Sequence, residues 1–251
     1  MNSTDESIGD VLITLGNLAG ALASYRASLA ITERLALRDP AHTGWQRDLS
    51  VSQEKIGDVL RAQGNLAGAL ESHGAAKAIR ERLTQQNPDN AGWQKDLSVS
   101  QERIGDVLMA QGTLADALES YHASLAIRER LTQQDPDNAE WLQALPLVHV
   151  RVGDVLRAQG NLAGALVSYR ASLAISERLA RQDPGNALSQ QILWVSCWKV
   201  AARLERQNQA AEALRYWQQA YATLSGMKRA GLFVSPQDER FLEPLRAKLG
   251  L

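Results

Sequence analysis

Apolar residues recur along this chain with the period of an α-helix, and the pattern comes in pairs. In residues 90–111 the apolar positions are Trp93, Leu97, Ile104 and Leu108, spaced so that they share one helical face. A second stripe of the same period runs over residues 114–131. The two stripes predict two amphipathic helices of about 18 to 22 residues, joined by a glycine-containing turn.

The whole helix pair returns at a fixed interval. Gly9, Gly57, Gly105 and Gly153 stand 48 residues apart, and each lies in a nearly identical segment, of which residues 56–70 are one copy. A fixed period of this length marks an array of repeats in which each unit packs on its neighbours. The chain therefore predicts an all-α solenoid of antiparallel helix pairs rather than one globular core.

The repeats divide the chain as follows. We expect an array over residues 1–227, made of a truncated unit at about 1–40, regular units at about 41–88, 89–136 and 137–184, and a degenerate unit at 185–227. Residues 228–251 are expected to form a loop and a C-terminal helix that caps the array, as terminal repeats require. Pro146 falls inside a predicted helix, where it predicts a bend or a break near Leu145.

Small residues recur at matching places on the two helices. Gly105 and Ala117 in the third unit correspond to Gly57 and Ala69 in the second. Because glycine costs about 1 kcal/mol inside a helix, its return at one helix-interior position predicts a close approach by the partner backbone. In the degenerate unit Asn208 replaces the turn glycine, and asparagine also tolerates the left-handed conformation.

These residues resemble a known family. Ile104-Gly105, Gly112, Ala117, Tyr121 and Pro136 carry the pattern of the tetratricopeptide repeat (TPR). The unit is longer than the family's usual length of about 34 residues, which implies that both helices are extended by about two turns. Residues 124–131 are similar to the long second helix of kinesin-light-chain-type repeats. The resemblance implies a right-handed superhelical solenoid whose first helices line a concave face.

Charge and composition narrow the function classes. Lysine and arginine (27) nearly balance aspartate and glutamate (28), so no net field favours nucleic acid or an anionic membrane. No stretch approaches the roughly 18 apolar residues of a membrane span. The polar, acidic N-terminus does not resemble a signal peptide, and Cys197 stands alone. A cytoplasmic protein without disulfides is expected.

We find no motif that carries chemistry. The chain lacks a phosphate-binding loop, a dinucleotide fingerprint, a nucleophile elbow and a zinc-binding histidine pair. Its histidines occupy different phases of different repeats, so a solenoid would not bring them together. Cys197 is expected to be a buried apolar residue. We therefore predict that the protein is not an enzyme and holds no metal or cofactor.

The candidate site is a polar face. In the TPR family the position after the repeat glycine points into the concave groove, and carrying this over gives a row of Asp10, Asp58, Asp106 and Asp154. A second row lies one turn earlier at Glu6, Glu54 and Glu102. The fourth copy breaks this second row with Val150. Arg61 and Arg157 follow their aspartates by three residues, where Ile13 and Met109 stand in the other copies.

Two interpretations of this face stay open. It is either an acidic groove for a basic or amine-bearing segment of a partner, or a solvated polar stripe whose aspartates pair within their own helices. The resemblance implies a non-catalytic scaffold that binds a protein or peptide, with neither nucleic acid nor membrane as partner. The alternatives are a self-associating structural array and a regulatory or sensor subunit of an enzyme system encoded on another chain.

Overall fold

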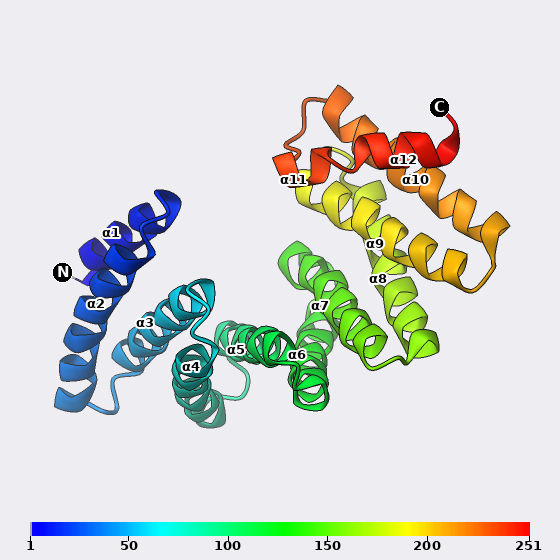
Figure 1. Cartoon of the computed structure of the whole chain (residues 1–251). Coiled ribbons are helices and arrows are strands. Elements are labelled where there is room, and N and C mark those ends of the chain that lie inside the picture. Colours follow the sequence, from blue (N-terminus) through cyan, green and yellow to red (C-terminus); the bar gives the residue numbers. More distant parts are fainter. Residues whose placement is uncertain (1) are drawn as a thin grey trace. The chain divides into compact units, whose positions relative to one another are not determined.

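The structure of the protein, a computed structural model, describes residues 2–251, and side chains from residue 6 onward. Within these residues the chain is all-α (Figure 1). The helices are α1 (Asn2–Thr14), α2 (Leu18–Arg38), α3 (Thr43–Ala62), α4 (Leu66–Gln86), α5 (Ala91–Gln111), α6 (Leu114–Gln134), α7 (Ala139–Ala158), α8 (Leu162–Gln182), α9 (Ala187–Arg206), α10 (Ala210–Arg229), α11 (Pro236–Glu239) and α12 (Leu242–Leu249). This confirms the predicted array of antiparallel helix pairs.

The array divides into two compact units, residues up to Ile127 and residues from Arg128 onward. In the first unit α2 packs on α1 and α3, and α4 packs on α3 and α5. In the second unit α8 packs on α7 and α9, and α10 packs on α9 and α12. Because α3 also contacts α5, and α7 contacts α9, the first helices of the pairs (α1, α3, α5, α7, α9) form one layer in each unit and the second helices form the other.

Asparagine side chains cap six of the described helices, α2, α4, α5, α7, α8 and α9. Asn65 accepts a hydrogen bond from the backbone N–H of Gly68, three residues into α4, at 3.0 Å. Asn90 does the same for Trp93 at the start of α5. Such caps satisfy backbone donors that no helical carbonyl reaches. At the turn before α10, Asn208 adopts φ 61°, which confirms that it replaces the left-handed glycine of the other units.

The repeat glycine makes room for an aromatic ring. A Cβ placed on Gly105 would lie 2.7 Å from Cε1 of Tyr121, and one on Gly153 would lie 2.4 Å from Cε1 of Tyr169. The prediction of close approach holds, but its cause was wrong: the nearest atoms belong to the tyrosine ring and not to the partner backbone. The ring fills the space that a side chain at the glycine position would take.

Pro146 does not break its helix. α7 runs without interruption from Ala139 to Ala158, so the predicted break near Leu145 does not occur. The helix is packed closely on both sides of the proline, with Leu142, Leu145 and Val148 all buried. Tertiary packing of these side chains offsets the backbone hydrogen bond that proline removes.

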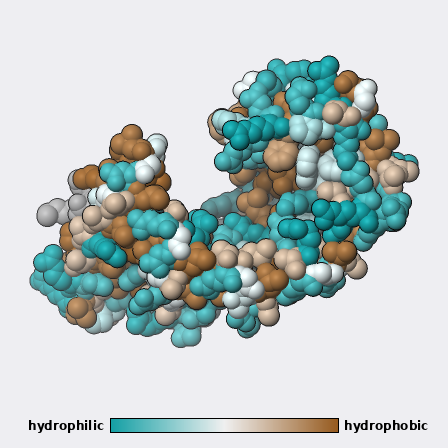
Figure 2. Space-filling model, in the orientation of Figure 1, coloured by the Kyte–Doolittle hydropathy of each residue, from teal (hydrophilic) through white to brown (hydrophobic). Residues whose placement is uncertain are grey.

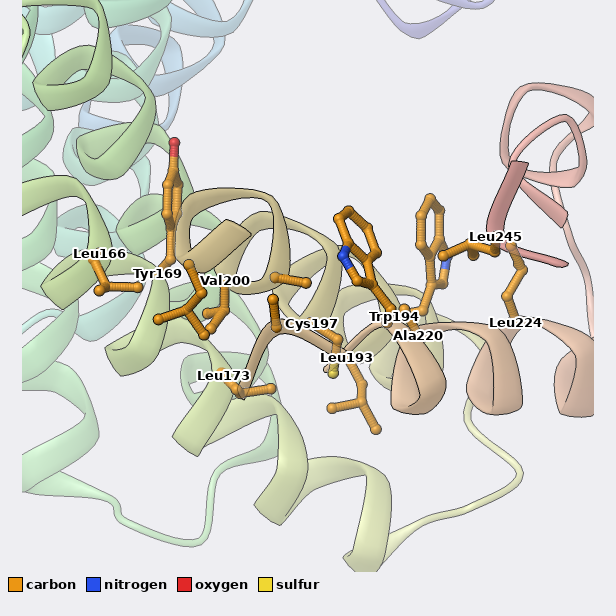
Figure 3. Close-up of a cluster of buried hydrophobic side chains, with 14 of the residues drawn as sticks. Leu166, Tyr169, Leu173, Leu193, Trp194, Cys197, Val200, Ala220, Leu224 and Leu245 are labelled. Carbon is orange, nitrogen blue, oxygen red and sulfur yellow. The ribbon is translucent and has the colours of Figure 1, made fainter. Parts of the chain in front are cut away.

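The last helix pair is closed by the C-terminal segment. Trp194, Cys197 and Trp217 are buried in one apolar cluster, to which α12 contributes Leu245 (Figure 3). Leu245 has no exposed surface, so α12 covers the apolar end of α9 and α10, as a terminal cap must. Cys197 has no exposed surface, which confirms it as a buried core residue, and burial raises the pKa of its thiol to about 12.

Glycine substitutions test the packing between ring and backbone. We expect Gly105→Ala to destabilise the array by about 1–3 kcal/mol, because the buried Tyr121 ring cannot move away from a new Cβ. The matched control is Gly74→Ala in α4, where no atom lies within 4 Å of the added Cβ. It should leave stability unchanged or raise it by up to about 1 kcal/mol. Urea unfolding followed by circular dichroism measures both; equal effects would contradict the interpretation.

Candidate functional site

The aspartate row is held in place by tyrosines of the second helices. The Tyr25 hydroxyl donates to Asp10 Oδ1 at 2.6 Å. Tyr121 donates to Asp106 at 2.6 Å, and Tyr169 to Asp154 at 2.7 Å. Figure 3 shows the Tyr169 hydroxyl pointing away from the apolar cluster that surrounds its ring. One side chain therefore fills the space over the glycine and fixes the carboxylate of the next residue.

Cations of the following repeat contact three aspartates of the row, Asp10, Asp58 and Asp154. Lys55 Nζ lies 2.6 Å from Asp10 Oδ1, and Lys199 Nζ lies 2.7 Å from Asp154 Oδ1. Arg103 Nε approaches Asp58 Oδ1 at 3.5 Å. Our sequence reasoning missed these partners, although a signal exists: Lys55, Arg103, Arg151 and Lys199 all stand 45 residues after an aspartate of the row.

The pairing changes the electrostatics of the row without removing it from the surface. Hydrogen bonds from Lys55 and then from Tyr25 lower the pKa of the Asp10 carboxyl. Burial, together with the neighbouring Asp10, raises the pKa of the Tyr25 hydroxyl above its ordinary value, so the tyrosine stays a donor. The Asp10 and Asp154 side chains remain 55% and 27% exposed. The row is thus a ladder of fixed ion pairs with solvent-accessible carboxylates.

The second repeat, residues 41–88, departs from this scheme because His73 replaces the tyrosine. The ring is fully buried over Gly57, and its Nε2 lies 3.7 Å from Asp58 Oδ1, too far for a hydrogen bond. Among the described residues neither ring nitrogen nor Asp58 Oδ1 has a hydrogen-bond partner. Burial lowers the pKa of His73 to about 4 and raises the pKa of Asp58. Asp58 is therefore the least firmly held carboxylate of the row whose contacts are described.

The predicted glutamate row lies deeper than the aspartates. Glu102 is only 8% exposed and accepts a hydrogen bond from Ser124 at 3.0 Å. Glu54 pairs with Arg80, a buried arginine that also donates to the Ser100 hydroxyl at 2.8 Å. Glu6 accepts from two serines, Ser28 and Ser52. These glutamates hold first and second helices together through a buried polar layer.

The remaining predicted residues lie at the edge of this face. Arg157 is exposed, and its Nε is 3.9 Å from Asp154 Oδ1, a weak contact beside that of Lys199. Arg61 is exposed. Its charge acts to lower the pKa of Asp58, but burial has the larger effect and the pKa is raised. Met109, at the same position of the next unit, is half-buried. Arg61 and Arg157 are therefore not the main partners of the aspartates.

Two negative findings apply to the described residues. Among the side chains of residues 6–251 there is no group of three or more histidine, cysteine, aspartate or glutamate residues arranged to hold a metal ion. No helix among them combines the length and apolar character needed to cross a lipid bilayer.

The histidine substitution predicts a pH dependence. The folded-state pKa of His73 lies below the unfolded value of about 6.5, so unfolding takes up a proton and stability falls as the pH drops. Between pH 7.5 and 5.5 we expect a loss of about 1.4 kcal/mol from this residue. His73→Tyr, which restores the residue of the other units, should abolish that component and raise stability at all pH values. Urea unfolding at several pH values checks it, and identical pH profiles would contradict it.

Comparisons with known proteins agree with this fold. The family model described as tetratricopeptide repeat matches residues 51–89. A structure of the Podosopora anserina putative kinesin light chain nearly identical TPR-like repeats is similar at 17% identity and a TM-score of 0.67, covering 90% of this chain and 96% of that one. BtubC (BKLC) from P. vanneervenii is similar at 16% identity and a TM-score of 0.69, with 91% and 80% covered.

A regulator shares the fold more distantly. The Rap conjugation gene regulator of the plasmid pLS20, in complex with the Phr* peptide, is 14% identical with a TM-score of 0.56. The similar region covers 89% of this chain and 53% of the regulator. No curated protein matches the chain. Residues 51–89 thus match the tetratricopeptide repeat family, and the chain as a whole has the TPR-like fold of these helix-pair structures.

Proposed function

We propose that this protein is a non-catalytic scaffold that binds a segment of a partner protein on the layer of first helices. Proteins of this repeat family generally bind proteins or peptides, and the similar regulator was solved with a peptide. Fold alone does not assign a function, so the proposal depends on the site. A regulatory subunit of another enzyme system would use the same binding step.

The observation that carries the proposal is the ladder of fixed carboxylates. Each carboxylate whose contacts are described is oriented before any partner arrives, by a tyrosine, by a cation of the next repeat, or by both. Preorganised groups lose little conformational entropy on binding, which favours recognition. For Asp10 these contacts fall on Oδ1, which leaves the second oxygen of this 55% exposed side chain for a donor of the partner.

The chemistry favours a partner segment with donor groups, such as lysine, arginine or backbone N–H. Charge-assisted hydrogen bonds of this kind contribute about 1.5–3 kcal/mol each. The neighbouring cations reduce the net negative charge of the row, which favours a segment of mixed polarity over a uniformly basic one. Repetition every 48 residues suits an extended segment that contacts several repeats within the first compact unit.

Neutralising the row tests the proposal. We expect the variant with Asp10, Asp58, Asp106 and Asp154 all changed to Asn to lose at least about tenfold in partner capture, because asparagine keeps the tyrosine contact but not the charge. The measurement is a pull-down from source lysate with quantitative mass spectrometry of the eluted proteins.

A control separates the row from net charge. Four exposed glutamates of the second helices, Glu33, Glu71, Glu119 and Glu129, can be changed to Gln with the same loss of charge. Partners lost with the asparagine variant but kept with the glutamine control would support recognition on the first helices. Capture that is unchanged by the asparagine variant, with helical circular dichroism intact, would sink the aspartate ladder as the binding site.

A second candidate function is self-association, favoured by an open apolar face on α1. Ile8 and Val11 are 46% and 58% exposed, whereas Ile56 and Val59, which stand at the same repeat positions, are 4% and 1% exposed. Figure 2 shows hydrophobic residues gathered at the surface of this first helix pair. We propose that a second copy covers this face, since exposed apolar patches mark interaction sites.

Light scattering tests self-association. The wild-type protein is expected to show a mass above 27.4 kDa that rises with concentration. Val11→Glu should hold it at the monomer mass, because a carboxylate cannot be buried without a partner. Leu37→Gln, at an exposed position of α2, serves as the control and should not change the mass. A wild-type monomer at every concentration would rule the candidate out.

A further inference from the structure

An ammonium group lies against both an aromatic ring and a carboxylate in two of the repeats. Lys55 Nζ is 5.8 Å from the centroid of the Tyr25 ring and 2.6 Å from Oδ1 of Asp10. Lys199 makes the same two contacts with its own tyrosine and aspartate, at 5.8 and 2.7 Å. A ring face beside a carboxylate attracts cations, so the array repeats the elements of a cation site and fills them with its own lysines.

The last helix pair rebuilds this arrangement with different residues. Trp217 of α10 stands at the repeat position of Tyr169, and the carboxylate belongs to Glu205 of α9. Lys248 Nζ lies 4.9 Å from the centroid of the Trp217 ring and 2.8 Å from Oε1 of Glu205. The ammonium now comes from α12, a helix of 8 residues, and not from a repeat helix of about 20. Tryptophan is also the ring that binds cations best.

A hollow of about 530 Å³ surrounds this ammonium group. Its lining includes Trp198, Glu205, Trp217 and Lys248, and we call it the tryptophan hollow. Trp198 meets Trp217 edge to face, with ring centroids 4.8 Å apart and planes at 82°. Trp217 is 4% exposed, so its ring is fixed by the core. The hollow has more space than the compact ammonium of a lysine needs, which leaves room for a bulkier cation.

Lys248 is held only weakly over the ring. The Lys248 and Glu205 side chains are 36% and 47% exposed, and an ion pair in such a position contributes little to stability. The helix itself is anchored elsewhere, by Leu245, which has no exposed surface. The flexible lysine side chain can therefore leave the ring while α12 stays in place.

We infer that the tryptophan hollow binds a quaternary ammonium group, which takes the place of the Lys248 ammonium on Trp217. A lysine ammonium carries three N–H donors and is strongly hydrated, so it needs acceptors as well as a ring. A quaternary ammonium has no N–H group, and aromatic faces with a nearby carboxylate are its usual binding site in proteins. Lys248 is then an internal competitor that occupies the site when no ligand is bound.

One charge of the lining opposes this ligand. Arg206 also lines the tryptophan hollow, and its side chain is exposed to solvent. Its guanidinium repels a bound cation, whereas the Glu205 carboxylate attracts one. Replacing this arginine by glutamine should therefore strengthen binding by about twofold or more, which is opposite to the effect of neutralising the glutamate.

Two sources could supply the ligand group, a free small molecule or a trimethylated lysine side chain. Four probes distinguish them: choline, its neutral isostere in which carbon replaces the charged nitrogen, N-acetyl-trimethyllysine amide, and N-acetyl-lysine amide. Tryptophan fluorescence of the full chain, titrated with each probe at constant ionic strength, measures affinity, because Trp198 and Trp217 line the hollow.

The inference requires that the methylated cation binds better than its matched control. Choline should bind about fivefold or more tightly than the neutral isostere, which would assign a free molecule. Binding of the trimethyllysine amide without binding of choline would assign the side chain, and it supports the inference equally. Equal affinity for choline and its isostere, or tighter binding of the unmethylated lysine amide, overturns it. Failure of both methylated probes to bind wild type and Lys248→Ala also overturns it.

Variants tie the binding to the hollow. Lys248→Ala removes the internal competitor and should bind about threefold or more tightly than wild type. Glu205→Gln, at an exposed position, and Trp217→Tyr, which restores the ring of the other repeats, should each weaken binding by a similar factor. The control is Lys77→Ala, which removes an exposed lysine that pairs with Glu81 in α4, and it should bind as wild type does. Unchanged affinity in both Lys248→Ala and Glu205→Gln, with helical circular dichroism intact, would contradict the inference.

This inference goes beyond the proposed function and does not depend on it. If lysate capture depends on the aspartates but no methylated cation binds, the hollow carries no ligand and the scaffold function stands. If choline binding depends on Glu205 while the asparagine variant captures the same proteins as wild type, the hollow is a ligand site and the aspartate ladder is wrong.

Discussion

The packing of an aromatic ring against a helix-interior glycine underlies the first four helix pairs, with a tyrosine in three of them and His73 in the second. The glycine removes a side chain from the first helix, and the ring from the second helix fills that space. The same tyrosine then presents its hydroxyl to the aspartate beside the glycine. One contact therefore sets the distance between the helices and the orientation of the carboxylate. A cation of the next repeat contacts the same aspartate and so links neighbouring repeats. The residues that pack the helices together therefore also form the charged surface.

The departures from this arrangement are informative because the rest of the array is so regular. His73 keeps the ring over the glycine but loses the hydroxyl, which leaves Asp58 without its usual donor. The last pair loses the glycine to Ala201 and the aspartate to Ala202, and it gains a buried arginine in place of a core valine. A repeat that only had to pack would keep an apolar residue at this position. The costly buried charge of Arg203 therefore indicates a further use.

Much of the fold could be predicted from local pattern. Apolar residues at helical spacing, asparagine caps and turn glycines act within a few residues of sequence, and the period of 48 shows that the same solution is used again. The prediction that Asn208 takes the left-handed conformation was confirmed. The predicted break at Pro146 was wrong, because the effect of a proline depends on how tightly neighbouring helices hold α7. The glycine position was identified correctly, but a one-dimensional pattern cannot tell a close backbone from a close aromatic ring.

The sequence by itself determined the repeat, the helix pairs and the positions of the aspartates, since each depends on contacts within a turn or on an exact period. Only the tertiary structure decided the partners of those aspartates and the burial of Glu102 and Arg203. Lys55 meets Asp10 across 45 residues, and Val155 and Arg203 share a repeat position but not a role. Such contacts depend on which faces of distant helices meet, and that is fixed by packing in three dimensions rather than by the order of residues.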